Sequence, residues 1–201
     1  MNWQTTLKSI IDFLIAMLGL LFLSPFFIVI ALLIKLDLPG SVFFVQERVG
    51  LKGKIFNFIK FRTMVEGARN MGLGLEVAQD DDRITNIGRW LRHWSLDELP
   101  QLINVLRGDM SLVGPRPSTP EQVARYTTHQ RRRLEVRPGL TGWAQINGRN
   151  LIPWPERIKL DIWYVDHWSL LLDIKILLKT IPVIVWRKGL YGQDGVVRDL
   201  S

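Results

Sequence analysis

Cysteine is absent from this chain of 201 residues, and histidine occurs only three times. The lack of cysteine excludes a disulfide framework, a thiolate nucleophile and a zinc site with cysteine ligands. Three scattered histidines make an all-histidine metal site a poor candidate as well. The composition leaves the redox compartment open and is compatible with a cytoplasmic location.

Acidic residues are fewer than basic ones, 19 against 26, which gives a formal net charge of +7. This balance favours a polyanionic partner: a nucleic acid, an anionic lipid or a phosphorylated substrate. A content of 47% hydrophobic and 22% charged residues excludes a disordered chain and a protein that crosses the membrane many times. The length fits one domain with appendages, including at most two membrane segments.

Residues 13–34 form the one long hydrophobic run, which is uncharged and nearly all aliphatic or aromatic. As a helix this run would extend roughly 33 Å, about the thickness of the hydrocarbon core of a bilayer. A cleavable signal peptide would have a shorter apolar region that ends in a small-residue cleavage site, whereas Pro39 and Gly40 follow here. We therefore expect residues 1–38 to be a retained membrane anchor.

Ser24 and Pro25 lie near the middle of this run. Pro25 lacks the amide hydrogen that would bond to the Leu21 carbonyl, so the sequence predicts a bend. One arrangement is a kinked single-pass helix, in which a serine hydroxyl satisfies the freed carbonyl, and the other is a re-entrant hairpin that returns to the same face. Lys8 and Lys35 make both flanks basic, which slightly favours the hairpin, but the residues leave both arrangements open.

Two apolar runs, residues 42–45 and 55–59, flank the turn sequence of residues 50–53 and predict a β-hairpin. By the two-residue period of a strand, Lys60 shares a face with the phenylalanines of the second run, and Arg62 continues that face. These two cations are candidates for binding phosphate, although charges on a solvated strand edge have the same pattern.

Residues 67–82 are rich in glycine and acidic residues and lack a clean period. We expect a mobile loop there, which near a site can act as a lid. Residues 84–94 follow with apolar residues at helical spacing, which predicts a helix.

Asp97 and Glu98 belong to the segment of the sequence that carries the most chemistry. We expect Asp97 to cap a helix that has Pro100 at about its third position and runs to Arg107, with Gly108 ending it. Acidic residues at a helix start are ordinary, so capping alone would explain the pair.

The same two carboxylates, with Arg92 just upstream, are also suited to chemistry on phosphate. Oxygen ligands are what Mg²⁺ requires, so Asp97 and Glu98 are candidate metal ligands, and a carboxylate can attack phosphorus directly. Adjacent helical side chains diverge by about 100°, so the two carboxylates do not share one face of an ideal helix. Different roles, with one carboxylate as the nucleophile and the other as a metal ligand or a handler of protons, fit this geometry better than a symmetric pair.

Arg116 lies between two prolines that hold its segment extended, which suits a bidentate grip on phosphate. The basic run of residues 131–133 is expected to form a helix face or an anionic-lipid contact. The glycine-punctuated residues 137–149 can contact a nucleotide or simply form turns.

Residues 169–189 predict an amphipathic helix with a narrow polar face, which can lie in the membrane interface or pack into the core. The chain is therefore predicted to be α+β and mostly helical. It would have a re-entrant or kinked N-terminal anchor, a small hairpin and interfacial helices around one compact domain at residues 39–189. Residues 190–201 would form a variable tail.

Six motifs resemble, in order, those of the bacterial sugar transferase family, in its small monotopic phosphoglycosyl transferase form. The resemblance extends from about Leu7 to Gly189. The motifs are the Ser-Pro pair at 24–25 and residues 60–64, 95–102, 108–111, 114–117 and 137–142.

This resemblance implies transfer of a phospho-sugar from a UDP-sugar to undecaprenyl phosphate, with release of UMP and a requirement for Mg²⁺. It implies that Asp97 is the nucleophile of a covalent intermediate, that Glu98 assists with metal or protons, and that Arg92 and Arg116 contact phosphate. It further implies a re-entrant anchor at Ser24-Pro25 and a catalytic domain on the cytoplasmic face of the bacterial inner membrane. An assembly of several copies is left open.

Two rival functions use the same residues. A membrane-tethered adaptor could use the basic surface to bind nucleic acid, but the chain lacks a helix-turn-helix pattern, zinc spacing or an RNA-binding aromatic motif, so we expect no nucleic-acid partner. A membrane phosphatase using Asp97 would release inorganic phosphate in place of UMP.

Overall fold

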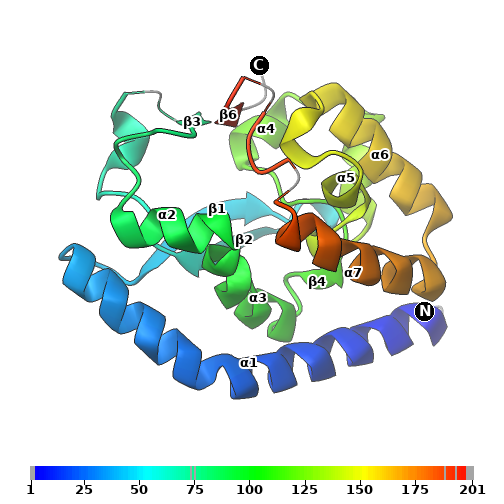
Figure 1. The fold of residues 1–201 in the computed structure, drawn as a ribbon. Coiled ribbons are helices and arrows are strands. Elements are labelled where there is room, and N and C mark those ends of the chain that lie inside the picture. Colours follow the sequence, from blue (N-terminus) through cyan, green and yellow to red (C-terminus); the bar gives the residue numbers. More distant parts are fainter. Residues whose placement is uncertain (1–2, 73, 75, 188, 193, 198–201) are drawn as a thin grey trace.

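Helix α1 (Trp3–Asp37) forms the lower edge of the molecule in the computed structural model, which describes residues 3–72, 74, 76–187, 189–192 and 194–197 (Figure 1). Its 35 residues extend beyond the hydrophobic run at both ends. The predicted bend is present, because the two ends of α1 rise toward the rest of the protein (Figure 1). The Ser24 hydroxyl donates to the Leu21 carbonyl at 2.8 Å, which satisfies the acceptor that Pro25 leaves free.

The N-terminal half of α1 is attached to the protein through the half-buried Lys8 and the buried carboxylates of Asp12 and Asp173. Lys8 Nζ lies 2.6 Å from Asp173 Oδ2 and 3.6 Å from Asp12 Oδ2. The Ser111 hydroxyl donates to Asp12 at 2.7 Å. Lys8, which the sequence presents as a flanking charge, is therefore an internal ion-pair partner.

The C-terminal end of α1 is attached in the same way. Arg62 donates from Nη2 to the Leu38 carbonyl at 2.7 Å and from Nη1 to the Pro39 carbonyl at 2.9 Å. The Ile87 amide donates to Asp37 at 3.1 Å. Both ends of α1 are thus bound to the same domain.

Strands β1 (Phe43–Val49) and β2 (Ile55–Phe61) pair antiparallel, from Phe43 opposite Phe61 to Val49 opposite Ile55. This confirms the predicted hairpin. A short 3₁₀ turn, η1 (Leu51–Gly53), connects the strands. Phe56 and Phe58 are buried on the face that also carries Lys60, as the two-residue period requires.

Helix α2 (Asn86–His93) begins at Thr85, whose hydroxyl accepts from the Gly88 amide at 2.9 Å. This confirms the helix predicted at residues 84–94, although the observed helix is shorter at both ends.

The expected cap at Asp97 is wrong. Ser95 has a left-handed backbone, and residues Leu96–Gln101 form a 3₁₀ helix, η3, so the turn begins before Asp97. Helix α3 (Leu102–Leu106) follows, and the chain turns at Gly108 with φ of 77°, where the helix was expected to end. Because Asp97 lies inside the 3₁₀ turn, its carboxylate is not used as a cap.

Strands β4 (Ser111–Val113) and β5 (Gly139–Thr141) form a parallel pair at the centre. Three glycines allow the backbones to approach here, because a Cβ at Gly114, Gly139 or Gly142 would lie 2.0–2.3 Å from a backbone atom. This crossing fixes the direction in which the chain leaves β4 toward Arg116.

The remaining helices cover the right and upper parts of the molecule in Figure 1. Helix α4 (Pro120–Ala124) begins with a capping box at Thr119. The others are η2 (Ala68–Asn70), η4 (Gln130–Glu135), α5 (Trp143–Ile146), η5 (Arg149–Leu151), α6 (Trp154–His167) and α7 (Leu170–Val185).

Arg133 contradicts the lipid contact that was one of the two predictions for the basic run. It is 3% exposed, and its Nη2 lies 2.5 Å from Asp161 Oδ2 on α6. It also donates to the Ser118 hydroxyl at 2.9 Å and to the Tyr126 hydroxyl. A buried guanidinium needs such partners, and they come from α6 and from the segment that precedes η4.

Helix α7 confirms the helix predicted from residue 169, with Ser169 accepting from the Leu172 amide at 3.2 Å. It combines both expected environments. Ile176 is fully buried, whereas an apolar stripe on another face is more than half exposed. The stripe consists of Leu171, Ile174, Leu178, Ile181 and Val185.

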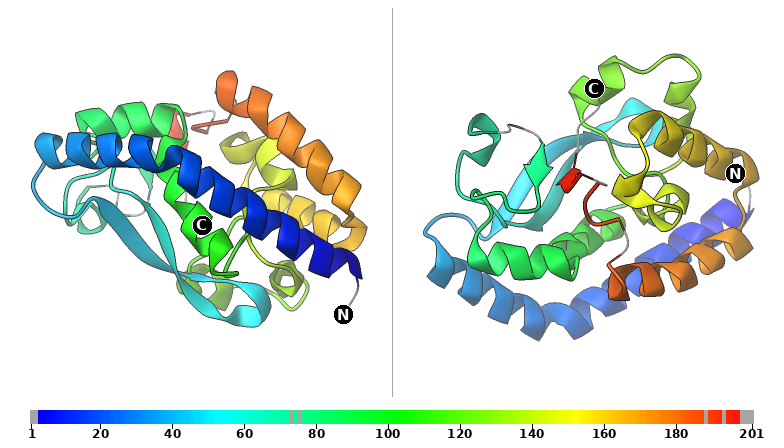
Figure 2. Two further views of the ribbon diagram at one scale, coloured as in Figure 1. Left: turned by 90° about the horizontal axis from the view of Figure 1, so that it is seen from below. Right: turned by 45° about the horizontal axis from the view of Figure 1, so that its top comes forward.

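Helices α1 and α7 are both visible in the view from below in Figure 2. Among the described residues, α1 is the one helix long and apolar enough to cross a membrane. Many of its apolar side chains are exposed, including Phe22 at 77% and Leu36 at 83%. Such a surface is typical of a protein that contacts a membrane.

Arg83 organises the segment at residues 67–82, which was expected to be a mobile loop. Its guanidinium bonds to Asp81 and to the carbonyls of four residues of the segment at 2.6–2.8 Å. The carbonyls belong to Ala68, Met71, Gly74 and Glu76. Strand β3 (Val77–Ala78) of this segment pairs with β6 (Val196–Val197) of the predicted tail.

Candidate active site

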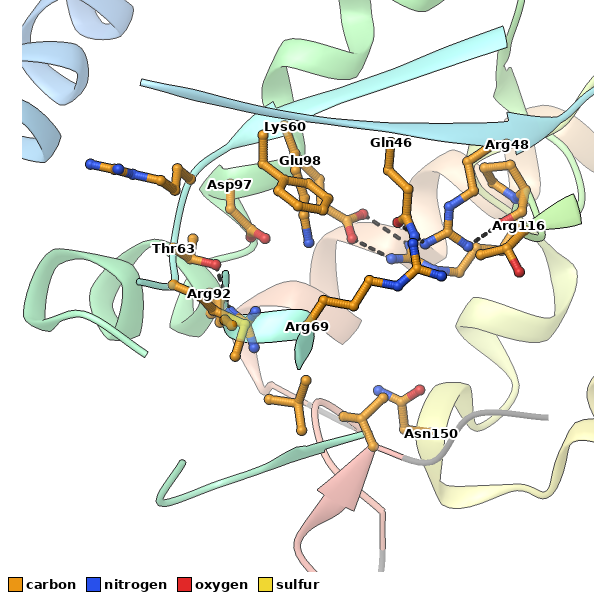
Figure 3. Close-up of a pocket in the computed structure, with 18 of the residues that line it drawn as sticks. Gln46, Arg48, Lys60, Thr63, Arg69, Arg92, Asp97, Glu98, Arg116 and Asn150 are labelled. Carbon is orange, nitrogen blue, oxygen red and sulfur yellow. Dashed lines mark hydrogen bonds and ion pairs between the residues drawn. The ribbon is translucent and has the colours of Figure 1, made fainter. Parts of the chain in front are cut away.

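A cavity of about 590 Å³ lies between the hairpin, η3, Arg116, the 3₁₀ turn η5 and the C-terminal segment, by which we mean residues 189–192 and 194–197 (Figure 3). Both carboxylates predicted to carry chemistry, Asp97 and Glu98, line it. Lys60, Arg92 and Arg116 line it as well. The structure therefore brings together residues from four separate segments of the sequence.

Glu98 and Arg116 form a bidentate ion pair. Arg116 Nη2 lies 2.6 Å from Glu98 Oε1, and Nη1 lies 3.1 Å from Oε2. This is the bidentate geometry expected of Arg116, but its partner here is a carboxylate of the protein. The pair fixes the orientation of Glu98 in the cavity.

Asp97 has a different environment. Its carboxylate is 7% exposed and makes no hydrogen bond or ion pair with any described residue. Burial raises the pKa of Asp97, and the neighbouring charge of Glu98 raises it further, while Lys60, Arg92 and Arg116 act in the opposite direction. Burial also opposes ionisation of Glu98, but the charge and hydrogen bonds of Arg116 outweigh it and lower the pKa of Glu98 to about 2.

The two adjacent carboxylates are therefore not equivalent. Glu98 is ionised and held by Arg116, whereas Asp97 is unpaired and faces the cavity (Figure 3). An unpaired carboxylate is the better candidate for a nucleophile, because its lone pairs are available. Both nevertheless line the same cavity, although they are adjacent residues of the 3₁₀ turn η3.

Lys60 is the cation most affected by its surroundings. Burial and the charge of Arg92 lower its pKa to about 8, against the opposing charges of Asp97 and Glu98. Arg92 is oriented by a hydrogen bond from Nε to the Thr63 hydroxyl at 2.8 Å.

Arg62 was predicted to bind phosphate, but its guanidinium is hydrogen-bonded to the protein backbone. Although Arg62 borders the cavity, both of its terminal nitrogens donate to backbone carbonyls that follow α1. The strand period places Arg62 on the correct side, but the nearby end of α1 provides carbonyls that need donors.

Arg149 is a cavity residue at the end of residues 137–149, the segment predicted to contact a nucleotide or to form turns, but it was not itself named as a candidate. Its φ is 52°, and its Nη2 lies 3.4 Å from the hydroxyl of Ser95, whose φ is 55°. Positive φ at a residue other than glycine costs about 1–3 kcal/mol and is concentrated at functional sites. The charge of Arg149 helps to lower the pKa of Glu98. Its position directly after Gly148, in a turn-rich segment, is the signal that could have identified it.

Arg157 is a second cavity cation that the sequence analysis did not single out. Burial lowers its pKa to about 10, and its Nη1 donates to Asn150 Oδ1 at 3.1 Å. Arginines and lysines outnumber carboxylates among the residues that line the cavity. This arrangement suits a ligand with several negative charges.

Comparison with known proteins agrees with this chemistry. The family model described as bacterial sugar transferase matches residues 3–187. The chain belongs to this family. The matched region contains α1, the hairpin, the acid pair and all of the cations described above.

Individual relatives support the same family. The chain is 46% identical to an uncharacterized sugar transferase, EpsL, of Bacillus subtilis, over 96% of this chain and 94% of the relative. It is 43% identical to an undecaprenyl-phosphate glucose phosphotransferase of Komagataeibacter xylinus, over 94% of this chain and 38% of that protein. It is 40% identical to an undecaprenyl-phosphate galactose phosphotransferase of Salmonella typhimurium, over 92% of this chain and 42% of that protein.

The chain spans nearly all of the Bacillus relative and about two fifths of the Komagataeibacter and Salmonella relatives, which are longer proteins. We conclude that this protein is an enzyme, a sugar transferase.

Proposed function

We propose that this enzyme transfers a sugar 1-phosphate from a UDP-sugar to undecaprenyl phosphate and releases UMP. The observation that carries the proposal is the unpaired Asp97 carboxylate in a cavity rich in cations, next to a Glu98 that is held by Arg116. The names of the Komagataeibacter and Salmonella relatives support undecaprenyl phosphate as the acceptor. A diphosphate donor and a phosphate acceptor match the surplus of cations around the cavity.

The proposed reaction has two displacements at one phosphorus. An Asp97 oxygen attacks the phosphorus that carries the sugar, a bond forms between them, and the bond from that phosphorus to the UMP oxygen breaks, so that UMP leaves with the electron pair. A phosphate oxygen of the lipid then attacks the same phosphorus and the Asp97 bond breaks, which restores the carboxylate. One small site can serve both substrates because UMP leaves before the lipid reacts.

The cations stabilise charge that develops in both displacements. Lys60, Arg92 and Arg149 face the cavity without an ion-pair partner within the described residues. Preorganised cations act strongly in a site shielded from water. Arg116 has a different role, because it keeps Glu98 ionised and in place.

Asp97 and Glu98 fit the requirement of Mg²⁺ for oxygen ligands. The described residues contain no group of three or more acidic, histidine or cysteine side chains that could hold a metal alone. Mg²⁺ commonly binds one or two carboxylates and completes its shell with waters and substrate phosphates, so two carboxylates suffice. Bound there, Mg²⁺ would neutralise charge on the phosphoryl oxygens.

Glu98→Gln tests this assignment. The substitution removes one charged ligand and the ion pair with Arg116, so we expect the Mg²⁺ concentration for half-maximal activity to rise about tenfold or more, with a much lower maximal rate. A metal titration of UMP release measures both. An unchanged titration midpoint would remove Glu98 from the metal site.

We also propose that α1 enters and leaves the membrane on the cytoplasmic face. Its N-terminal half is bound through Lys8 to Asp173, and its C-terminal end is bound through Asp37 and the carbonyls of Leu38 and Pro39. Because both ends contact one domain, a spanning orientation would require one set of contacts to break. A shallow α1 with the exposed stripe of α7 would hold the cavity near the lipid headgroups.

Protease access to a tag at the N-terminus tests this topology. In inside-out membrane vesicles, we expect the tag to be cleaved as readily as a site introduced in the exposed turn at Lys54, because both would face the medium. Protection of the tag in vesicles where the Lys54 site is cleaved would show a spanning helix.

The reaction itself is tested with a panel of UDP-sugars and undecaprenyl phosphate in detergent or nanodiscs. We expect UMP to be released with one or a few donors and a lipid diphosphate-sugar to form. Release of inorganic phosphate from the lipid without UMP would identify a phosphatase instead. Salt-sensitive DNA binding with no UMP release from any donor would favour the adaptor.

The pKa of Lys60 predicts how the reaction depends on pH. The ammonium group is present below about pH 8 and is lost above it, so we expect kcat/KM for the donor to decline on the alkaline side from about pH 8. Lys60→Arg keeps the charge at high pH and should shift this decline upward by more than one pH unit. The same alkaline decline in Lys60→Arg would assign it to another group.

A further inference from the structure

The wall of the cavity opposite the acid pair is formed by two segments that are far apart in the sequence. Val77, from β3, and Leu190, Tyr191 and Val197, from the C-terminal segment, line the same cavity as Asp97. Figure 3 shows the two paired strands and Asn150 across the cavity from Lys60, Asp97 and Glu98. The C-terminal segment is therefore part of the site.

Hydrogen bonds to backbone carbonyls hold this segment in place. The Asn150 side chain donates to the Leu190 carbonyl at 2.7 Å, and the backbone N–H of Asn150 donates to the Gly189 carbonyl at 3.2 Å. The Gln79 amide donates to the Gly195 carbonyl at 2.9 Å, next to the β3–β6 pair. Asn150 follows Arg149 directly, so the wall is attached to the cationic part of the site.

The wall and the opposite side of the cavity differ in chemistry. The opposite side, here called the floor, carries the charged groups Lys60, Asp97 and Glu98. The wall presents the aliphatic side chains of Val77, Leu190 and Val197 and the ring of Tyr191. Phosphates are suited to the floor. A ring with an apolar face, such as a pyranose or a nucleobase, is suited to the wall.

The position of the wall shows which substrate it can contact. Strands β3 and β6 lie at the upper edge of the molecule in Figure 1, and α1 lies at the lower edge. A polyprenyl chain embedded in the membrane around α1 approaches from below. The soluble donor is the substrate that can occupy the space beneath β3 and β6.

We propose that residues 189–192 and 194–197 form a donor-binding wall, with Leu190 and Tyr191 packing against the non-phosphate part of the UDP-sugar. This inference rests on the proposed function and adds the donor contact to it. The contacted part is a ring with an apolar face, which either the sugar or the uracil supplies. The wall thus selects the donor and leaves the lipid acceptor unaffected.

The test uses the full-length enzyme in nanodiscs with the UDP-sugar that gives the highest rate in the panel. We expect the double variant Leu190→Ala/Tyr191→Ala to raise the donor KM at least tenfold and to leave the KM for undecaprenyl phosphate within twofold. Val196→Ala is the matched control, because Val196 neighbours Val197 on β6 but does not line the cavity. It should leave both KM values within twofold.

Competition by UMP identifies the ring. A rise in the UMP inhibition constant that matches the rise in donor KM assigns the wall to uracil, whereas an unchanged UMP constant with an altered preference among sugars assigns it to the sugar. An unchanged donor KM in the double variant, or an equal rise in the lipid KM, would overturn the inference. Failure of the wild-type enzyme to release UMP would instead overturn the proposed function.

Discussion

Asp97→Asn is expected to abolish the reaction. Asparagine occupies nearly the same volume, so the cavity and the Glu98–Arg116 pair should persist, but the amide lacks the charge and lone pairs of a nucleophile. We expect UMP release to fall by at least about 10⁴-fold, as is common when a nucleophile is removed.

The covalent step can be observed directly. Wild-type enzyme treated with the donor in the absence of lipid should gain the mass of one sugar phosphate, and Asp97→Asn should gain none. The control Asp82→Asn, at an exposed acidic residue, should behave like the wild type. Substantial turnover by Asp97→Asn, or the same mass gain, would contradict the assignment of the nucleophile.

Arg83→Met is expected to have the largest effect on stability. Arg83 is 7% exposed and supplies the donors for four backbone carbonyls and for the buried carboxylate of Asp81. Methionine fills much of the space but donates no hydrogen bond, so these acceptors and the charge of Asp81 lose their partner. Removal of one member of a buried ion pair costs about 3–5 kcal/mol.

A loss of this size should lower the apparent Tm by roughly 10 °C in a domain of this length. Limited proteolysis should then cut the chain within residues 67–82, and the pairing of β3 with β6 should weaken. Arg89→Met, at an exposed arginine on α2, is the matched control and should leave the Tm within about 2 °C. A stable Arg83→Met variant that resists the protease would show that the segment is held by other contacts.

The stability prediction also bears on the expectation of a mobile lid. The low periodicity of residues 67–82 correctly indicated a segment with little regular structure. It could not show that Arg83, just outside the segment, binds four of its carbonyls, because hydrogen bonds to the backbone leave no pattern in the side chains. Whether the segment also moves during the reaction is a separate prediction.

Several features follow from local patterns in the sequence. The apolar run, the hairpin around residues 50–53, helix α2 and the start of α7 each depend on neighbours within a few residues, and each is present. The order of the motifs also identified the family and the acid pair, since these are properties of the residues themselves.

Other features depend on contacts between distant residues. Lys8 and Arg133 look like surface charges in the sequence, but the fold pairs Lys8 with Asp173 and the buried Arg133 with Asp161. Arg62 is drawn to the end of α1 for the same reason. A charge takes the partner that the fold brings near it, and periodicity does not contain that information.

The sequence alone therefore determined the family, the carboxylate pair, the set of cations and the long apolar run. The folded molecule assigns the parts: Arg116 neutralises Glu98 and leaves Asp97 unpaired, and the C-terminal segment closes the cavity that the acid pair faces. Burial and distance set the charge state of each group, and both arise only when segments separated by many residues pack together.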